Sequence, residues 1–140
     1  MFNLLPFATG RENILLPLAF SGQKSAKLQD PKAEALRLTS AMGLSADVIT
    51  GPRASDLSIG QQQRIAAARA LIGSPNLILA DEPTSALDEE TQGAFVALLM
   101  EQAKEAQATL IMVSHDRRLA SHFDRSVDLH DIANLGETPP

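Results

Sequence analysis

Two short apolar segments, at 77–81 and 109–113, constrain what this chain can fold into more than any other feature of its sequence. Neither segment alternates apolar with polar residues, which is typical of parallel strands in a sheet covered on both faces. The residues between them, at 89–106, have the pattern of a helix, and parallel strands are usually connected through a helix. The sequence therefore predicts an α/β fold with a parallel sheet.

The remaining segments predict a first half that is mostly helical. Asp30 can cap a helix that begins with Pro31 and stops at Gly43. The other expected elements are an irregular docking segment at 1–29, a polar loop at 47–56, a helix at 58–72, a short helix at 117–121 and an edge strand at 125–129. With 140 residues, of which 44% are hydrophobic, the chain is long enough for one domain with an apolar core.

Charge and composition exclude several classes of function. A net charge of -5 and a pI of about 5.1 argue against a nucleic acid as partner. The absence of cysteine excludes disulfides and thiolate metal sites. The longest apolar runs, such as ILLPLAF at 14–20, are shorter than the roughly 20 residues that cross a bilayer. We therefore expect a soluble, cytoplasmic protein.

Two adjacent carboxylates end the first apolar segment. In open parallel sheets, ligands bind beyond the carboxyl ends of the strands, where Asp81 and Glu82 are expected. Asp81 could hold Mg²⁺ beside a nucleotide phosphate, and Glu82, which faces differently, could orient or deprotonate an attacking water. A solvated turn before Pro83 would explain the same pair, and for the pair alone this simpler interpretation is favoured.

Two further segments make a functional interpretation stronger. In LSIGQQQR at 57–64, Ser58 can cap the next helix and Gly60 lets the backbone approach a ligand, so the helix start could bind an anion. In IMVSHD at 111–116, the carboxyl end of the second apolar segment is followed directly by Ser114 and His115. Each feature alone is better explained by structure than by function, but three such features at strand ends and helix starts are improbable by chance.

Together these segments resemble the carboxyl-terminal part of an ATP-binding cassette (ABC) ATPase. LSIGQQQR resembles the family signature, LILADE at 77–82 the Walker B strand, SALD at 85–88 the D-loop, and VSHD at 113–116 the switch-histidine loop. The segment at 2–18 is similar to the stretch after the Q-loop in lipoprotein-release and macrolide-export cassettes. The resemblance implies a P-loop NTPase-like parallel sheet with a helical signature subdomain, which is incomplete because the Walker A half is absent.

The resemblance also implies residue roles in ATP hydrolysis with Mg²⁺. Asp81 would support Mg²⁺, Glu82 would act as general base, His115 would contact the γ-phosphate, and Asp88 would couple the two sites of a head-to-tail dimer. Residues of the signature would meet the γ-phosphate held by the opposite subunit, namely Ser58, Gly60 and Gln61. Ile59 stands where the family has glycine and could crowd the phosphate.

The implied partners are a membrane-spanning transporter subunit and a second ABC ATPase subunit, with a separate chain carrying the Walker A half as a further candidate. The chain would then lie at the cytoplasmic face of the cell membrane. We expect residues 1–75 to form the post-Q-loop segment and signature subdomain, and residues 76–140 to carry the Walker B, D-loop and switch-histidine parts. No G-x-x-x-x-G-K-[ST] segment occurs in the sequence, so the chain alone is expected to be inactive.

Three hypotheses about function stay open from the sequence, and a non-transport role, as in the soluble cassette ATPases of DNA repair and translation, is a further alternative against which the acidic charge argues. The chain is a truncated or split transporter ATPase that needs the amino-terminal half, a non-hydrolytic module that regulates a complete ATPase through the dimer interface, or a gene remnant without function. Because strands of the family sheet would be missing, we also expect a sheet edge and an apolar face to be left uncovered.

Overall fold

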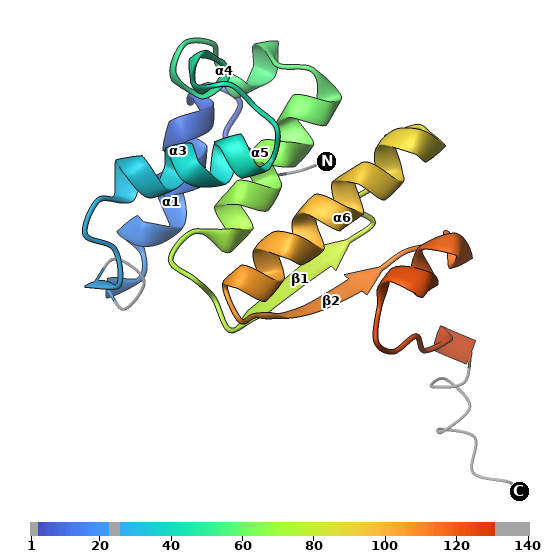
Figure 1. The fold of residues 1–140 in the computed structure, drawn as a ribbon. Coiled ribbons are helices and arrows are strands. Elements are labelled where there is room, and N and C mark those ends of the chain that lie inside the picture. The colour runs from blue at the N-terminus through green and yellow to red at the C-terminus, as the bar shows by residue number, and fades with distance from the viewer. Residues whose placement is uncertain (1–2, 23–25, 131–140) are drawn as a thin grey trace, which may run out of the picture.

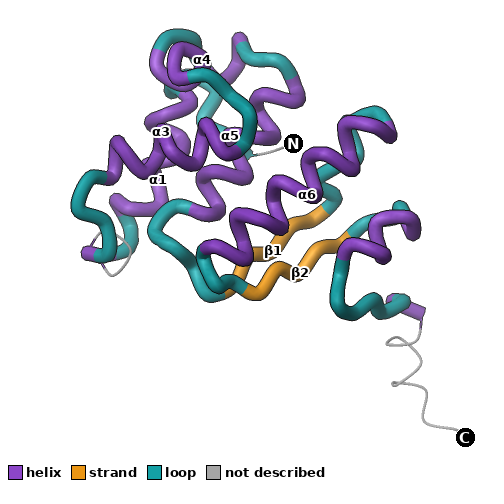
Figure 2. Tube along the Cα trace, in the orientation of Figure 1, coloured by secondary structure: helices purple, strands orange, loops and turns teal. Residues whose placement is uncertain are grey.

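The structure, a computed structural model, describes residues 3–22 and 26–130 (Figure 1). The helices described in the first half of the chain pack together, and a longer helix lies over a small sheet on the other side of the molecule (Figures 1 and 2). The elements are, in chain order, α1 (Gly10–Ala19), α3 (Pro31–Ala41), α4 (Ala46–Thr50), the 3₁₀ helix η1 (Ala54–Asp56), α5 (Ile59–Leu71), β1 (Leu77–Asp81), α6 (Glu89–Glu105), β2 (Thr109–Val113) and the 3₁₀ helix η2 (Arg117–His122).

The sheet has the predicted parallel pairing. β1 and β2 run side by side in a register that pairs Leu77 with Thr109 and Asp81 with Val113. Helix α6 connects them and covers one face of the sheet (Figure 1). Because the strands are parallel, both carboxyl ends lie at the same edge, so the residues after Asp81 and after Val113 are brought together.

The other face of this sheet is exposed among the described residues, so the expectation of a sheet covered on both faces is wrong. Along β1, Ile78 is buried toward α6, whereas Leu77 and Leu79 are 49% and 69% exposed. Along β2, Ile111 and Val113 are 51% and 45% exposed. The expectation of an uncovered apolar face is thereby confirmed, because these four large apolar side chains stay 45–69% exposed.

The helix predicted from Asp30 to Gly43 is present as α3. The Asp30 carboxylate accepts hydrogen bonds from the N–H groups of Lys32 and Ala33, each at 3.0 Å, and Pro31 is the first helical residue. Met42 and Gly43 close the helix, and Gly43 adopts a φ of 70°, a left-handed conformation that favours glycine.

The segment expected to be irregular contains a helix. Helix α1 begins with a capping box in which the Thr9 hydroxyl accepts the Glu12 N–H, while the Glu12 carboxylate accepts the Thr9 N–H. Pro17 lies within the helix, which is why the sequence pattern suggested a break. Burial of Ile14 and of Asn13, whose side chain bonds three backbone groups, fixes α1 to the rest of the molecule.

Two smaller predictions are also wrong. The expected polar loop at 47–56 contains α4 and η1, because Ile49 and Ala54 are buried and hold these turns against the core. The expected strand at 125–129 is absent, because no described strand lies beside it to supply ladder hydrogen bonds. The short helix expected at 117–121 is confirmed in position, as a 3₁₀ helix.

One apolar core connects the helices to the sheet. It contains residues of α1, α3, α4, α5 and α6, and it reaches β1 and η2. Its largest fully buried side chains include Phe95, Ile14, Leu38, Met42, Ile49, Ile65 and Ile72. The proposed boundary between residues 75 and 76 stays a prediction.

Candidate functional site

The carboxyl edge of the sheet carries Asp81 and Glu82. Asp81 ends β1 and is exposed. Glu82 follows in a left-handed backbone conformation, with a φ of 45°, and its N–H donates to the Val113 carbonyl at 3.0 Å. The two carboxylates therefore start from different backbone conformations, Asp81 from the strand and Glu82 from the turn that follows it.

Glu82 and His115 meet at this edge, as their positions in the sequence suggested. Their side chains are separated by 3.3 Å between Glu82 Oε1 and His115 Nε2. The Glu82 side chain is 27% exposed and its Oε1 forms no hydrogen bond, whereas the His115 side chain is 97% exposed. The carboxylate of Glu82 can accept a proton, and the exposed imidazole beside it can donate a hydrogen bond to a neighbouring group.

The signature segment forms a second part of the site at the start of α5. The Ser58 hydroxyl accepts the Gln61 N–H at 3.2 Å, and the Gln61 side chain accepts the Ser58 N–H at 2.9 Å, so the predicted cap is confirmed and is a full capping box. At Gly60, an added Cβ would meet only Leu87 at 4.0 Å. Internal packing therefore does not require glycine there, and the space above it is open to a ligand.

The D-loop lies between these two parts. Leu87 faces Gly60 at the start of α5, and Asp88 caps α6 by accepting the N–H and the hydroxyl of Thr91, each at 2.9 Å. The capping role of Asp88 was missed, although an acidic residue before a helix is a recognisable signal. The assigned roles of the site residues in nucleotide binding stay predictions.

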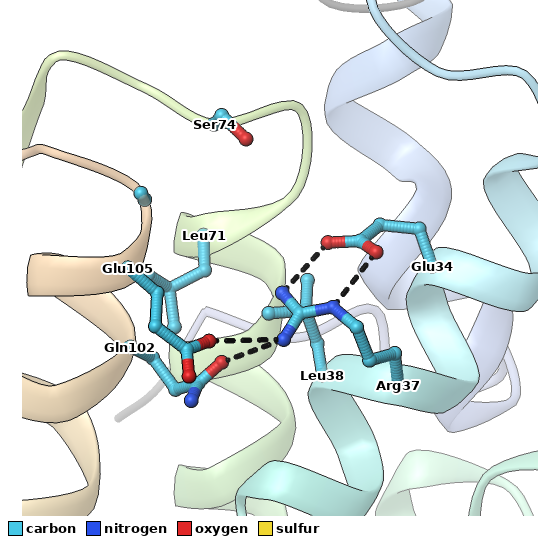
Figure 3. Close-up of a pocket in the computed structure, with 8 residues that line it drawn as sticks. Glu34, Arg37, Leu38, Leu71, Ser74, Gln102 and Glu105 are labelled. Carbon is cyan, nitrogen blue, oxygen red and sulfur yellow. Dashed lines mark hydrogen bonds and ion pairs between the residues drawn. The ribbon is translucent and has the colours of Figure 1, made fainter.

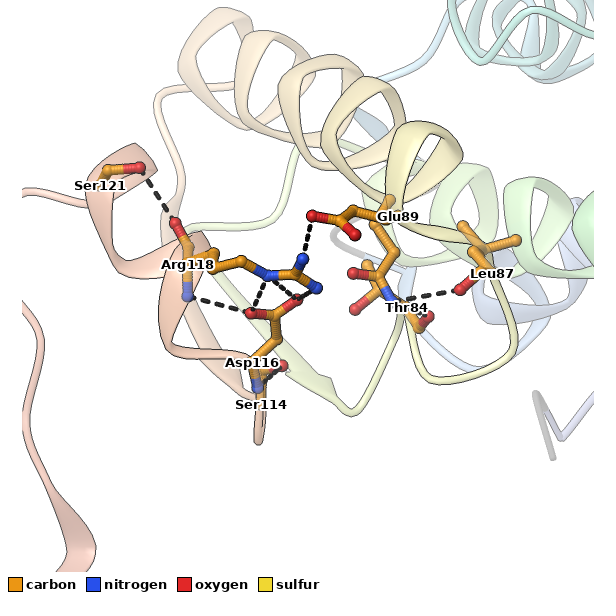
Figure 4. Close-up of polar contacts among 8 residues, drawn as sticks. Thr84, Leu87, Glu89, Ser114, Asp116, Arg118 and Ser121 are labelled. Atoms are coloured by element: carbon orange, nitrogen blue, oxygen red, sulfur yellow. Dashed lines mark hydrogen bonds and ion pairs between the residues drawn. The ribbon is translucent and has the colours of Figure 1, made fainter.

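Two interactions near the site could not be read from the sequence. Gln63, on α5, donates a hydrogen bond from Nε2 to the Pro83 carbonyl. Arg118 in η2 contacts the Asp116 carboxylate through three hydrogen bonds and also contacts Glu89 at the start of α6 (Figure 4). Both join segments distant in sequence, which local patterns do not reveal.

Arg118 and its two carboxylate partners, Asp116 and Glu89, stabilise one another in their charged forms. The Arg118 guanidinium and N–H lower the pKa of Asp116 below its ordinary value, and the same contacts, first to Asp116 and then to Glu89, raise the pKa of Arg118. Asp116 directly follows His115, so this contact holds one end of the switch-histidine loop near α6 (Figure 4).

Two arginines of the signature helix connect it to other segments of the chain. Arg64 Nη1 donates to the Met42 carbonyl at 2.6 Å, and Arg69 Nη1 donates to the Asn3 carbonyl at 2.8 Å. Burial lowers the pKa of Arg69.

Mg²⁺ fits this site only as an ion held by few protein ligands. Among the described residues no group of three or more His, Asp or Glu side chains could hold a metal. Mg²⁺ is commonly bound by one or two carboxylates together with water and substrate phosphates, and the exposed Asp81 can serve in that way.

A small cavity of about 210 Å³ lies elsewhere, between α3 and α6 (Figure 3). Arg37 crosses it, donating to Glu34 on its own helix and to Gln102 and Glu105 on α6 (Figure 3). None of the predicted site residues lines this cavity, so it is a junction between helices and not part of the candidate site.

Comparison with known proteins defines the class. The family model described as "ABC transporter" matches residues 2–85. The structure resembles "Dimeric Structure of MJ0796, a Bacterial ABC Transporter Cassette", with a TM-score of 0.69 and 37% identity over 86% of this chain and 51% of that one. A post-hydrolysis state of the same cassette, bound to ADP and Pi, matches with a TM-score of 0.68 and 38% identity. The chain belongs to the ABC transporter family.

Within this family, the chain is similar to ATP-binding proteins of lipoprotein-releasing systems. It is 41% identical over 138 residues to LolD of Xanthomonas axonopodis pv. citri, covering 99% of this chain and 54% of that protein. It is 37% identical over 129 residues to LolD of Legionella pneumophila (strain Paris), covering 92% and 55%. The chain spans about half the length of these relatives. No helix in the described ranges is long and apolar enough to span a membrane.

Proposed function

We propose that the chain serves as the ATP-hydrolysing part of an ABC transporter of the lipoprotein-releasing type, and that it needs an amino-terminal half with a Walker A loop for turnover. The observation that carries this proposal is the 3.3 Å approach of Glu82 Oε1 to His115 Nε2 at the carboxyl edge of a parallel sheet. The family membership and the similarity to LolD supply the substrate class, ATP.

Each candidate site residue has its own role in the proposed ATP hydrolysis. Glu82 accepts the proton of the attacking water through its carboxylate, and the exposed His115 imidazole donates a hydrogen bond to the transferred phosphate. Asp81 would hold Mg²⁺, which supplies charge neutralisation on the phosphate oxygens when bound. The signature residues Ser58 and Gln61 lie at the start of α5, away from the strand ends that carry Glu82 and His115. In this proposal they contact the nucleotide that a second subunit holds.

The partners follow from this assignment. A second cassette would complete a head-to-tail dimer through the signature segment and Asp88, and a membrane-spanning subunit would place the protein at the inner face of the membrane. The uncovered face of β1 and β2 would receive the amino-terminal half, because four large apolar side chains are exposed there, Leu77, Leu79, Ile111 and Val113.

The test is reconstitution of ATP turnover. The 140-residue chain is expected to show no turnover alone and to gain it when mixed with a separately produced amino-terminal half of a LolD-type cassette. Glu82→Gln, which removes the base but keeps the shape, is expected to lower kcat of the mixture at least about 100-fold. Robust hydrolysis by the pure chain would contradict the need for the other half, and unchanged turnover in Glu82→Gln would contradict the assigned base.

A second candidate is a module that regulates a complete cassette without hydrolysing ATP itself. The observation in its favour is that the capping box of Ser58 and Gln61 and the open space at Gly60 are already formed in this chain. Such a module would change the turnover of a complete LolD-type ATPase upon mixing, and Glu82→Gln would leave that change intact.

A further inference from the structure

The conformation of Glu82 needs support from its surroundings. A φ of 45° is unfavourable for a residue with a side chain, and such conformations persist only where neighbouring contacts determine them. The Glu82 N–H is held by the Val113 carbonyl, and its carbonyl accepts the Ser85 N–H at 3.3 Å and the Ser85 hydroxyl at 3.1 Å. These contacts fix the start of the turn at 82–88.

Two side-chain amides hold the rest of this turn. Gln63 donates from α5 to the carbonyl of Pro83, the residue that directly follows Glu82. Gln92 donates from α6 to the carbonyls of Thr84 at 3.2 Å and Leu87 at 3.1 Å. The turn at 82–88 is therefore clamped between α5 and α6.

Gln63 is the buried member of this clamp. Its side chain is 2% exposed, so the contact between its Nε2 and the Pro83 carbonyl is shielded from water, and its Oε1 forms no hydrogen bond among the described residues. Burying a side-chain amide costs free energy of folding unless the amide forms a hydrogen bond. Gln63 also lies on the first turns of α5, the helix that Ser58 and Gln61 begin.

We propose that Gln63 is a positioning residue for hydrolysis: by holding the Pro83 carbonyl it fixes the left-handed backbone of Glu82 and ties the signature helix to the general base. This inference rests on the proposed role of Glu82. The contact also connects two parts of one chain that would serve different nucleotides. The signature segment would meet the nucleotide held by the other subunit, and Glu82 would act on the nucleotide of its own subunit.

The first test measures amide hydrogen exchange by NMR in the 140-residue chain. Gln63→Met keeps the length of the side chain and removes the donor. Exchange at the amides of Glu82, Ser85 and Leu87 is expected to become about tenfold faster, while exchange at Phe95 and Val96 within α6 changes less than about twofold. The matched control is Gln62→Met, because Gln62 Nε2 donates to the Leu57 carbonyl at 2.9 Å and not to the turn.

Each outcome of this test decides the role of Gln63. Selective acceleration in Gln63→Met, absent in Gln62→Met, supports the clamp. Unchanged exchange in the turn, or a uniform acceleration across the chain, would overturn it. If Gln63→Met does not fold, Gln92→Met tests the same clamp from α6, and it is expected to accelerate the same three amides.

The second test uses the chain reconstituted with the amino-terminal half. Gln63→Met is expected to lower kcat about tenfold with KM for ATP within about twofold of wild type, because the base is displaced but the nucleotide contacts remain. A rise in KM with unchanged kcat would contradict a positioning role. If the wild-type mixture shows no turnover, the proposed function fails, whereas the exchange result still establishes whether Gln63 holds the turn.

Discussion

Single side chains decide where the helices around the candidate site begin. Ser58 and Asp88 each supply an acceptor to the first turn of α5 and α6, and the loss of such a cap typically costs about 1 kcal/mol. Thr9 and Glu12 do the same for α1. These caps fix the ends of the loops that carry the signature segment and the D-loop, so local polar contacts set the geometry of the candidate site.

The cap of α1 makes the stability of the protein depend on pH through Glu12. Its carboxylate accepts the N–H of Thr9 at 2.8 Å and the hydroxyl at 2.9 Å, and these bonds lower the pKa of Glu12 below its ordinary value of 4.5. Because the pKa is lower in the folded state, this stabilisation is complete above pH 4.5 and is lost as pH falls through the lower folded value.

Replacing Glu12 by Gln is therefore expected to reduce the free energy of unfolding near neutral pH and to have little effect below the folded pKa. Urea denaturation at a series of pH values measures this difference. Glu101→Gln, on the exposed side of α6, makes the same change in net charge and serves as control. A loss of stability in Glu12→Gln that does not shrink on acidification would show that the carboxylate does not act through its charge.

Between elements, α3 and α6 are joined by Arg37. Its guanidinium pairs with Glu34 at 2.9 Å and with Glu105 at 3.2 Å, and the hydrogen bond to Glu34 is the main cause that raises its pKa (Figure 3). The side chains of Arg37 and Glu105 are 49% and 53% exposed, so solvent screens the pair that crosses between the helices.

A double-mutant cycle with Arg37→Met and Glu105→Gln is expected to give a coupling free energy of about 0.2–1 kcal/mol, which is typical of exposed pairs. The coupling should diminish at 1 M salt, and denaturant unfolding at both salt concentrations measures it. A coupling well above this range, or one insensitive to salt, would mean that the α3–α6 junction is held more rigidly than its exposure suggests.

The elements themselves could be predicted where one local signal was sufficient. The strands at 77–81 and 109–113 and helix α5 were predicted from apolar runs and from Ser58, and the structure confirms them. Helix α1 was missed because Pro17 indicates a break, although the cap at Thr9 outweighs it. The contact between Gln63 and Pro83 depends on the packing of α5 beside the turn, and no sequence pattern contains that information.

At the scale of the whole molecule, the sheet divides the chain into a covered and an uncovered side. Ile78 is buried in the core, whereas four other large apolar side chains of the strands are exposed, Leu77, Leu79, Ile111 and Val113. Apolar strands exposed in this way promote association, because each large side chain removed from water contributes roughly 1.5–3 kcal/mol.

Leu79 is the most exposed of these side chains, at 69%, so Leu79→Lys is expected to leave the thermal midpoint of the isolated chain nearly unchanged while reducing its self-association. The same substitution should weaken binding of the amino-terminal half, because a lysine ammonium would be placed in the interface without a partner. Light scattering over a concentration series and titration with that half measure the two effects.

Ile78→Lys, on the buried side of the same strand, is the matched control and should unfold the chain. If Leu79→Lys reduced self-association but bound the amino-terminal half as tightly as wild type, the exposed face would join copies of this chain and would not be the surface that completes the cassette.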